Sequence, residues 1–384
     1  MRIERKINCT ITPLFLASYL AVILFSCVRN HEYDHYGGYC HLSTAPSGFF
    51  RIEQFDGRFF LVTPEGNAFR AVGINHFHMI ETTAYDSIVE SLKSMGFNSG
   101  CYQGPKWMWN RFPYTQGINL VETCSFYSED KFTFEDVFDS LYLARIEIKI
   151  ERIVSPQAEN TYLIGYFLTD IPIWYQKKYG IGWIDFFRTL PEDSPGGAAW
   201  RTWRLANPCL PEEDFIPVIA RQIYSNGTAL IRKFDRNHLI FSDRYHQQGF
   251  PDKVVREVLP FVDGVATQPS SHLNLKYFET LYTNYQKPIF IADHVSSFKT
   301  QSHPLTMEQV AENPEDYITF YSSYILEVLS LPYIVGINKC QYMDEIRDGL
   351  LKQGLVRQDG RPYSYVDRLS EAHQRALNHA YKFK

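Results

Sequence analysis

The sequence predicts an α/β protein with the fold of a (β/α)8 TIM barrel, and the order of its segments carries this prediction. Eight short apolar segments alternate with segments of helical periodicity over roughly 300 residues, which suits such a barrel. No Gly-x-Gly-x-x-Gly motif follows the first apolar segment, and this counts against the alternative, a doubly wound dinucleotide-binding sheet. In a barrel, the loops after the carboxyl ends of the strands hold the active site.

The barrel strands are expected where short apolar runs end in turn or polar residues. The first is "FRAVGINHF" at 69–77, and the helix "DSIVESLKSMG" follows it at 86–96. The other strands are expected at 97–102, 117–122, 162–170, 238–245, 262–269, 288–294 and 333–344. Further helices are expected from about Phe134, from about Pro211 and at 316–329.

A β-meander is predicted before the barrel, in residues 49–69. Apolar and polar residues alternate there around two turn signals, Asp56-Gly57 and Pro64-Glu65-Gly66. We therefore expect residues 49–384 to form a single domain that begins with this meander.

A long insertion is predicted after the fourth strand, in residues 175–210. It is rich in Gly and Pro and is typical of an active-site lid. All six tryptophans follow either the second or the fourth strand: Trp107, Trp109, Trp174, Trp183, Trp200 and Trp203. We expect at least half of these rings to form the core of the insertion and the others to contact a ligand.

Residues 1–26 are predicted to be a lipoprotein signal peptide. Three basic residues precede an apolar run at 14–25 that is too short to span a membrane comfortably. The run ends in "LFSC", which resembles the lipobox of bacterial lipoproteins and predicts acylation of Cys27, followed by a polar tether at 27–48. The protein would then be an envelope lipoprotein, periplasmic or at the outer membrane, that meets the membrane only through its lipid. The alternative is an uncleaved anchor helix.

Charge and cysteine content limit the class of partner. The net charge of -5 and the pI of about 6.2 give no basic stripe, so nucleic acid is not an expected partner. The mature chain would keep an odd set of cysteines with no Cys-x-x-Cys motif, so we expect neither a disulfide framework nor a structural zinc site. These cysteines are Cys40, Cys101, Cys124, Cys209 and Cys340. No cofactor is indicated, and the oligomeric state is left open.

The segment "DGRFFLVTPEGNAFRAVGINHF" at 56–77 is similar to the opening of agarase-like and β-galactosidase-like (β/α)8 glycoside hydrolases. In that family a Gly-Arg-aromatic hairpin leads into a first strand ending in Gly-(Val/Ile)-Asn. Later strand ends agree in order, from "LIGYF" at 163–167 to "VGINKCQYMD" at 335–344, so the resemblance spans residues 49–365. It implies hydrolysis of O-glycosidic bonds in a poly- or oligosaccharide.

The resemblance also implies two catalytic carboxylates, which are both Glu in the family and follow strands four and seven. Here Asp170 takes the place of the family's Asn, Ile171 that of the acid/base Glu, and Asp293 that of the nucleophile. Because Ile cannot transfer a proton, Asp170 is expected to donate it, with its apolar neighbours favouring the protonated form. The shorter side chains would widen the pair toward roughly 6.5–9.5 Å and favour inversion. Otherwise Asp170 holds a substrate hydroxyl or caps the following turn.

Other residues at the strand ends are expected to bind the sugar. The candidates are Asn75, His76, Trp174, Arg244, Tyr245, Gln268, His294 and Gln341. Arg244 would also suit a sulfate or carboxylate, unless it forms a structural ion pair with Asp243. Lys339 is expected where the family has a Trp platform.

Two alternatives to a glycosidase remain open. One is a metal-dependent barrel similar to the amidohydrolases, whose ligands would be His76, His78, His246, His272 and Asp344. The other is a non-catalytic glycan-binding lipoprotein, which the Ile at the acid position and the aromatic residues favour. Turnover of an oligosaccharide separates the second alternative from an enzyme.

Overall fold

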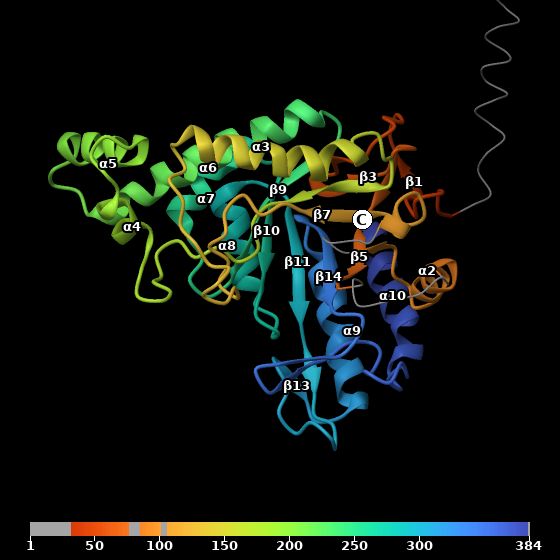
Figure 1. The fold of residues 1–384 in the computed structure, drawn as a ribbon. Coiled ribbons are helices and arrows are strands. Elements are labelled where there is room, and N and C mark those ends of the chain that lie inside the picture. The colour runs from red at the N-terminus through yellow and green to blue at the C-terminus, as the bar shows by residue number, and fades with distance from the viewer. Residues whose placement is uncertain (1–31, 77–84, 101–105, 383–384) are drawn as a thin grey trace, which may run out of the picture.

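Eight parallel strands close into a barrel in the computed structural model, which describes residues 32–76, 85–100 and 106–382 (Figure 1). In chain order they are β5 (Ala71–Ile74), β6 (Ser99–Gly100), β7 (Tyr114–Gly117), β8 (Leu163–Phe167), β9 (Leu239–His246), β10 (Gly264–Gln268), β11 (Ile289–Val295) and β14 (Ile334–Cys340). Each strand pairs with the next, and β14 pairs with β5 to close the ring. The predicted (β/α)8 fold is confirmed.

The third strand lies earlier than the sequence pattern predicted. It is Tyr114–Gly117, paired with β8, and not the apolar run at 117–122. That run leaves the barrel and is buried as a loop, where the Tyr142 hydroxyl donates to the carbonyl of Leu120 (3.1 Å). Its apolar character therefore reflects packing under helices and not pairing in a sheet.

Helices surround the barrel and turn an apolar stripe toward it. They are α2 (Tyr85–Ser94), α3 (Ser140–Val154), α6 (Ile216–Phe234), α7 (Asp252–Val258), α8 (Leu275–Tyr285), α9 (Pro314–Ser330) and α10 (Leu369–Tyr381). Short 3-10 turns are Lys106–Met108, Ser155–Gln157, Glu212–Phe215, Leu259–Phe261 and Val366–Arg368. Side chains cap several helices; Asp139 accepts from the Leu141 amide at the start of α3, and Asn313 does the same for α9. Within the described residues no helix has the length and apolar character needed to cross a membrane.

An antiparallel sheet closes the amino-terminal end of the barrel. Its strands are β1 (Tyr39–Ser43), β2 (Arg51–Phe55), β3 (Arg58–Val62) and β4 (Asn67–Phe69), in the order β1-β4-β3-β2. The side chains of Phe50, Leu61 and Phe69 share one buried cluster with residues at the starts of the barrel strands, among them Ala71, Ile164, Leu239 and Val335. The predicted β-meander is confirmed, and it acts as an apolar plug.

The predicted tether at 27–48 is wrong for most of its length. Strand β1 lies within it and pairs with β4, and Tyr39 stacks on Tyr381 of α10 (4.8 Å between ring centroids). Asp34 accepts a hydrogen bond from the Asn67 amide (2.8 Å). These contacts come from residues distant in sequence, so the polar composition alone did not reveal them. The predicted signal peptide and Cys27 lie outside the described residues.

The predicted insertion after strand four is present and contains α4 (Trp183–Thr189) and α5 (Pro195–Ala206), which lie at one edge of the molecule (Figure 1). Trp174 stacks on Trp183 (5.7 Å, 19°) and contacts Tyr224 of α6. Only 1% of the Trp174 surface is exposed. The expectation that Trp174 stacks on a sugar is therefore corrected, because its ring belongs to the aromatic core that fixes the insertion to the barrel.

Replacing Trp174 by alanine should destabilise the protein by about 3 kcal/mol, since the substitution leaves a cavity among buried rings. Urea denaturation followed by circular dichroism measures this change in the free energy of unfolding. Tyr175→Ala is the matched control, because Tyr175 is 39% exposed, and it should cost well under half as much. Equal stability of the two variants would contradict the structural role of Trp174.

Short strands and turns complete the carboxyl-terminal end of the barrel. They are β12 (Ser297–Phe298) with β13 (Gln309–Ala311), and the hairpin β15 (Glu345–Arg347) with β16 (Leu350–Lys352). Both pairs belong to the connections that follow the last two barrel strands. The hairpin matters for the site, because it carries Lys352 back toward the barrel mouth.

Candidate functional site at the barrel mouth

Asp293, near the end of β11, is the centre of one half of the mouth. The Asn75 side-chain amide donates to Asp293 Oδ1 (2.6 Å), and His76 Nε2 lies 4.0 Å from Asp293 Oδ2. Burial raises the pKa of Asp293, but the hydrogen bond with His76 and the nearby charges of Lys352, His76 and Arg244 hold the net pKa well below the ordinary value. Asp293 is therefore a carboxylate at neutral pH, and Asn75 and His76, both expected to bind the sugar, lie beside it.

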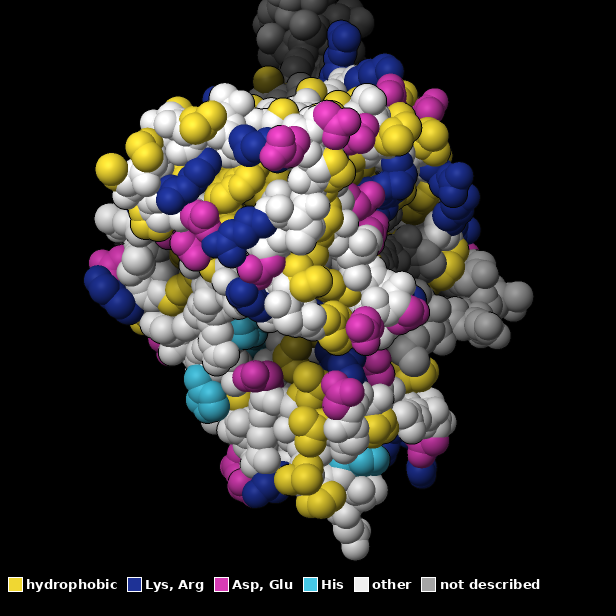
Figure 2. Space-filling model, turned by 60° about the vertical axis from the view of Figure 1, so that its left-hand side comes forward, with side chains coloured by type: hydrophobic (Ala, Val, Ile, Leu, Met, Phe, Trp, Pro, Cys, Tyr) yellow, Lys and Arg dark blue, Asp and Glu magenta, His cyan; other side chains and the backbone are white. Residues whose placement is uncertain are grey.

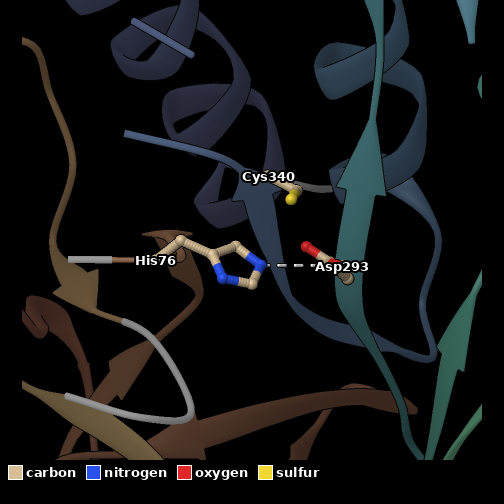
Figure 3. A group of neighbouring side chains, drawn as sticks. All are labelled: His76, Asp293 and Cys340. Carbon is tan, nitrogen blue, oxygen red and sulfur yellow. Dashed lines mark ion pairs between the residues drawn. The ribbon is translucent and has the colours of Figure 1, made fainter. Parts of the chain in front are cut away.

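Cys340 and Lys352 complete this half of the mouth, and sequence reasoning did not identify either as a site residue. Figure 3 shows His76, Asp293 and Cys340 pointing toward one another, and their ligand atoms all lie within 4.8 Å. Lys352 Nζ is 3.4 Å from His76 Nε2. Because Lys339 was expected in the cleft, strand alternation from it would have turned Cys340 away from the site. No signal in the sequence would have indicated Lys352, which reaches the site from a hairpin.

The cluster already has a cation from the protein itself, the ammonium of Lys352. His76, Asp293 and Cys340 have donor atoms that suit a metal such as zinc. Burial lowers the pKa of Lys352, but Cys340 and Asp293 raise it, so that its net pKa is above the ordinary value and the ammonium is charged. A buried ammonium beside the three donor atoms opposes a metal ion by charge repulsion.

The metal set expected for an amidohydrolase-like barrel is not assembled among the residues that the structure describes. His246 accepts from the Gln248 amide (3.2 Å), and His272 contacts Phe320. Asp344 accepts from the Gly354 amide and the Tyr363 hydroxyl (2.7 and 2.6 Å). Neither His246, His272 nor Asp344 belongs to the cluster of possible metal ligands, and His78 lies outside the described residues.

Asp170 is the centre of the other half of the mouth. Arg244 Nη2 lies 2.8 Å from Asp170 Oδ2, and the Gln268 side-chain amide donates to Asp170 Oδ1 (2.7 Å). Arg244 is 1% exposed, so little solvent screens this ion pair. Each side-chain oxygen of Asp170 therefore has a polar partner within the protein. The expectation of an apolar surrounding for Asp170 is wrong, and its contacts oppose the expected role of proton donor.

Ile171 lies beside Asp170 with its backbone in the left-handed region (φ 41°). Its amide donates to the Arg244 carbonyl (3.3 Å), and its own carbonyl accepts from the Ser125 amide (2.8 Å). A β-branched residue is strained in this conformation and persists there only when its surroundings hold it. The position where the family has its acid/base Glu is thus occupied by an apolar residue. Hydrogen bonds hold the backbone of that residue on both sides.

Three expected cleft residues face away from the barrel interior, because successive side chains on a strand alternate. Tyr245 is buried against Phe250 (5.4 Å between ring centroids). His294 stacks on Tyr324 (4.0 Å), and burial lowers its pKa to about 4. Lys339 Nζ donates to the Tyr317 hydroxyl (2.7 Å) of α9 and so does not replace a platform in the cleft.

Gln341 has a supporting role. It is fully buried, and its side-chain amide donates to the carbonyl of Lys352 (3.2 Å). It therefore fixes the hairpin that brings the Lys352 ammonium to Asp293. The structure therefore gives Gln341 this indirect role in place of the predicted contact with a sugar.

The closed barrel and its meander define an α/β TIM barrel, with acidic residues after strands four and seven at its mouth. No protein-family model matches the sequence, and a search of curated proteins found no match. Solved structures are similar: an exo-β-agarase (14% identity, TM-score 0.76, covering 97% of this chain and 71% of that one) and a second agarase (16%, 0.75, 99% and 71%). A β-galacturonidase from Eisenbergiella tayi bound to galacturonate is more distant (13%, 0.55, 85% and 54%). These likenesses show the fold of the agarase-like and β-galactosidase-like glycoside hydrolases, as the resemblance implied.

Proposed function

We propose that this protein binds a poly- or oligosaccharide at the barrel mouth and does not hydrolyse it. The observation that carries this proposal is the ion pair between Asp170 and Arg244, completed by Gln268. Both oxygens of the carboxyl group nearest to the position of the family's acid are thereby occupied by protein partners. The fold of the solved glycosidases supports a carbohydrate as the ligand.

Hydrolysis of a glycosidic bond needs a group that gives a proton to the leaving oxygen. Ile171 has none, and Asp293 is ionised beside Lys352 and His76. Burial raises the pKa of the Cys340 thiol, and the pKa of Lys352 is also raised, so neither group releases a proton readily at neutral pH. The described groups of the mouth can instead hydrogen-bond sugar hydroxyls through charged partners, which gives strong and directional contacts.

Binding and turnover can be measured separately. Oligosaccharides from agarose and from galacturonan, together with β-glucuronides, should be titrated calorimetrically, and the same mixtures analysed by NMR for new reducing ends. We expect binding to at least one glycan and no product. Arg361→Ala, at a residue whose side chain is 75% exposed, is the control and should bind like the wild type. Turnover of a glycan that binds would contradict the proposal.

A glycosidase with an Asp170 and Asp293 pair is the second candidate. The observation that favours it is that Asp293, at the position of the family's nucleophile, is a buried carboxylate whose pKa the charges of Lys352, His76 and Arg244 lower. In that case Asp170→Asn should lose about 10²- to 10⁴-fold activity on natural glycans and much less on activated aryl glycosides. Asp293→Asn should fail on both substrates. The anomer of the fresh product, followed by NMR, would separate inversion from retention.

We also propose that Cys27 carries a lipid and holds the protein on a bacterial envelope, on the basis of the "LFSC" segment. Cells labelled with a fatty-acid analogue should yield a labelled chain, and Cys27→Ser should lose the label. Cys209→Ser, at an exposed cysteine, is the control and should keep it. An unlabelled, membrane-extracted chain of full length would indicate an uncleaved anchor instead.

A further inference from the structure

A cavity of about 510 Å³ lies beside the mouth, on the side of Ile171. Ile171 and Pro172 form one part of its wall, and Gln176, Lys178 and His246 form others. The strained backbone of Ile171 is thus the border between the ion pair of Asp170 and this cavity. The residue at the position of the family's acid/base Glu, Ile171, thus lines this cavity.

A second cavity, of about 360 Å³, lies along the insertion. Its wall is aromatic and includes Phe132, Phe134, Tyr179 and Phe186, together with Lys178. Lys178 is shared with the first cavity. Figure 2 turns the side that carries α4 and α5 toward the viewer, and hydrophobic patches lie there between charged side chains of both signs.

Lys178 holds the two walls of this groove together. Its ammonium donates to the carbonyls of Ser125 and Tyr127, and lies 5.3 Å from the ring centroid of Phe132 and 5.1 Å from that of Tyr179. The loop after β7 and the insertion after β8 are therefore fixed to each other at this point. The groove is a built feature of the fold, because cation–π contacts and backbone hydrogen bonds define its shape.

Tyr179 presents its ring to solvent although its backbone is strained. Its φ of 53° places a bulky residue in the left-handed region, and 49% of its surface is exposed. The Tyr179 hydroxyl donates to the Tyr127 carbonyl (3.1 Å), which fixes the ring. Strained residues that the surroundings hold in place are found preferentially at ligand sites. Ile171 and Tyr179, both strained, lie in the walls of the two cavities.

We propose that a linear glycan chain occupies this groove, running from Ile171 past Lys178 to the Tyr179 ring. The inference rests on the proposed function, and it makes the ligand an oligosaccharide of several units and not a single sugar. The apolar faces of sugar rings suit the aromatic wall, and their hydroxyls suit Gln176 and His246. The walls of both cavities include residues of the segment 171–179, which directly follows Asp170 of the mouth, and this adjacency favours a glycan over a peptide as the occupant.

The test is the dependence of affinity on chain length. The glycan that binds in the panel above is prepared as a series from disaccharide to octasaccharide and titrated into the wild type, Tyr179→Ala and Tyr175→Ala. Affinity for the wild type should rise with length. Tyr179→Ala should bind the longest member about three- to tenfold more weakly and the disaccharide unchanged, since one ring contact is lost. Tyr175 lines neither cavity, so its variant should match the wild type.

The outcomes separate this inference from the proposed function. Equal affinity of the wild type for short and long members, or equal effects of Tyr179→Ala and Tyr175→Ala, would overturn the groove and leave the mouth as the binding site. No binding of any member to the wild type would overturn both. Thermal melting of each variant shows that a loss of affinity does not come from unfolding.

Discussion

Replacing Arg244 by methionine should destabilise the protein by about 3–5 kcal/mol and abolish glycan binding at the mouth. The variant leaves the carboxylate of Asp170 in a largely buried position without its cation, and breaking one partner of a buried pair costs this much. The hydrogen bond from Gln268 remains but does not replace a charge. Urea denaturation at neutral pH measures the stability, and calorimetric titration measures the binding.

Two further variants test whether the stability lost in Arg244→Met comes from the uncompensated charge of Asp170. Arg244→Met combined with Asp170→Asn removes both charges and should recover much of the lost stability, because no uncompensated charge is left. Arg256→Met breaks an exposed pair with Asp252 (2.9 Å, side chains about half exposed) and should cost less than about 1 kcal/mol. If Arg244→Met proves as stable as Arg256→Met, the pair with Asp170 does not form in solution.

Asp293→Asn should also be costly at neutral pH, by about 1–3 kcal/mol, because the buried Asn75 amide and the nearby charges of His76 and Lys352 lose the carboxylate. The effect should depend on pH. The pKa of Asp293 is lower in the folded protein than its unfolded value of about 3.9, so its carboxylate contributes stability above pH 4. That contribution is lost as the pH falls from there toward the folded pKa. The difference between wild type and variant should therefore be constant near neutrality and shrink in acid.

Urea denaturation of both proteins from neutral pH down to about pH 3 checks this behaviour. The double variant Asp293→Asn with Lys352→Met is the control, since it removes the cation together with its partner and should be more stable than Asp293→Asn alone. A single variant as stable as the wild type at neutral pH would show that Lys352 is not paired with Asp293.

The sequence was sufficient for the barrel and for part of the mouth. Strand ends in a parallel barrel meet on one face, so Asn75, Asp293 and Gln268 could be placed there from their positions alone. The third strand was misplaced, because an apolar loop packed under helices has the same composition as a buried strand. The tether was misjudged, because β1 gains its stability from partners distant in the chain.

Charge partners in the mouth were the least predictable feature. Asp170 has apolar neighbours in the sequence, yet its side chain meets Arg244 and Gln268, which come from two later strands. Lys352 lies in a hairpin segment whose sequence is typical of an exposed turn. It comes near Asp293 only when that hairpin folds back. Such contacts depend on tertiary packing, so a local sequence pattern does not predict them.

The apolar plug closes one end of the barrel and leaves the other end open. Strands β11 and β14 run from the plugged end toward the mouth (Figure 1), so the mouth opens at the opposite end of the barrel. If Cys27 carries the proposed lipid, the anchor lies six positions before Tyr33, which pairs with Tyr39 of the sheet at the plugged end. The bilayer would then lie beneath the plug. The proposed glycan site at the mouth would face away from the membrane, where large polymers can reach it.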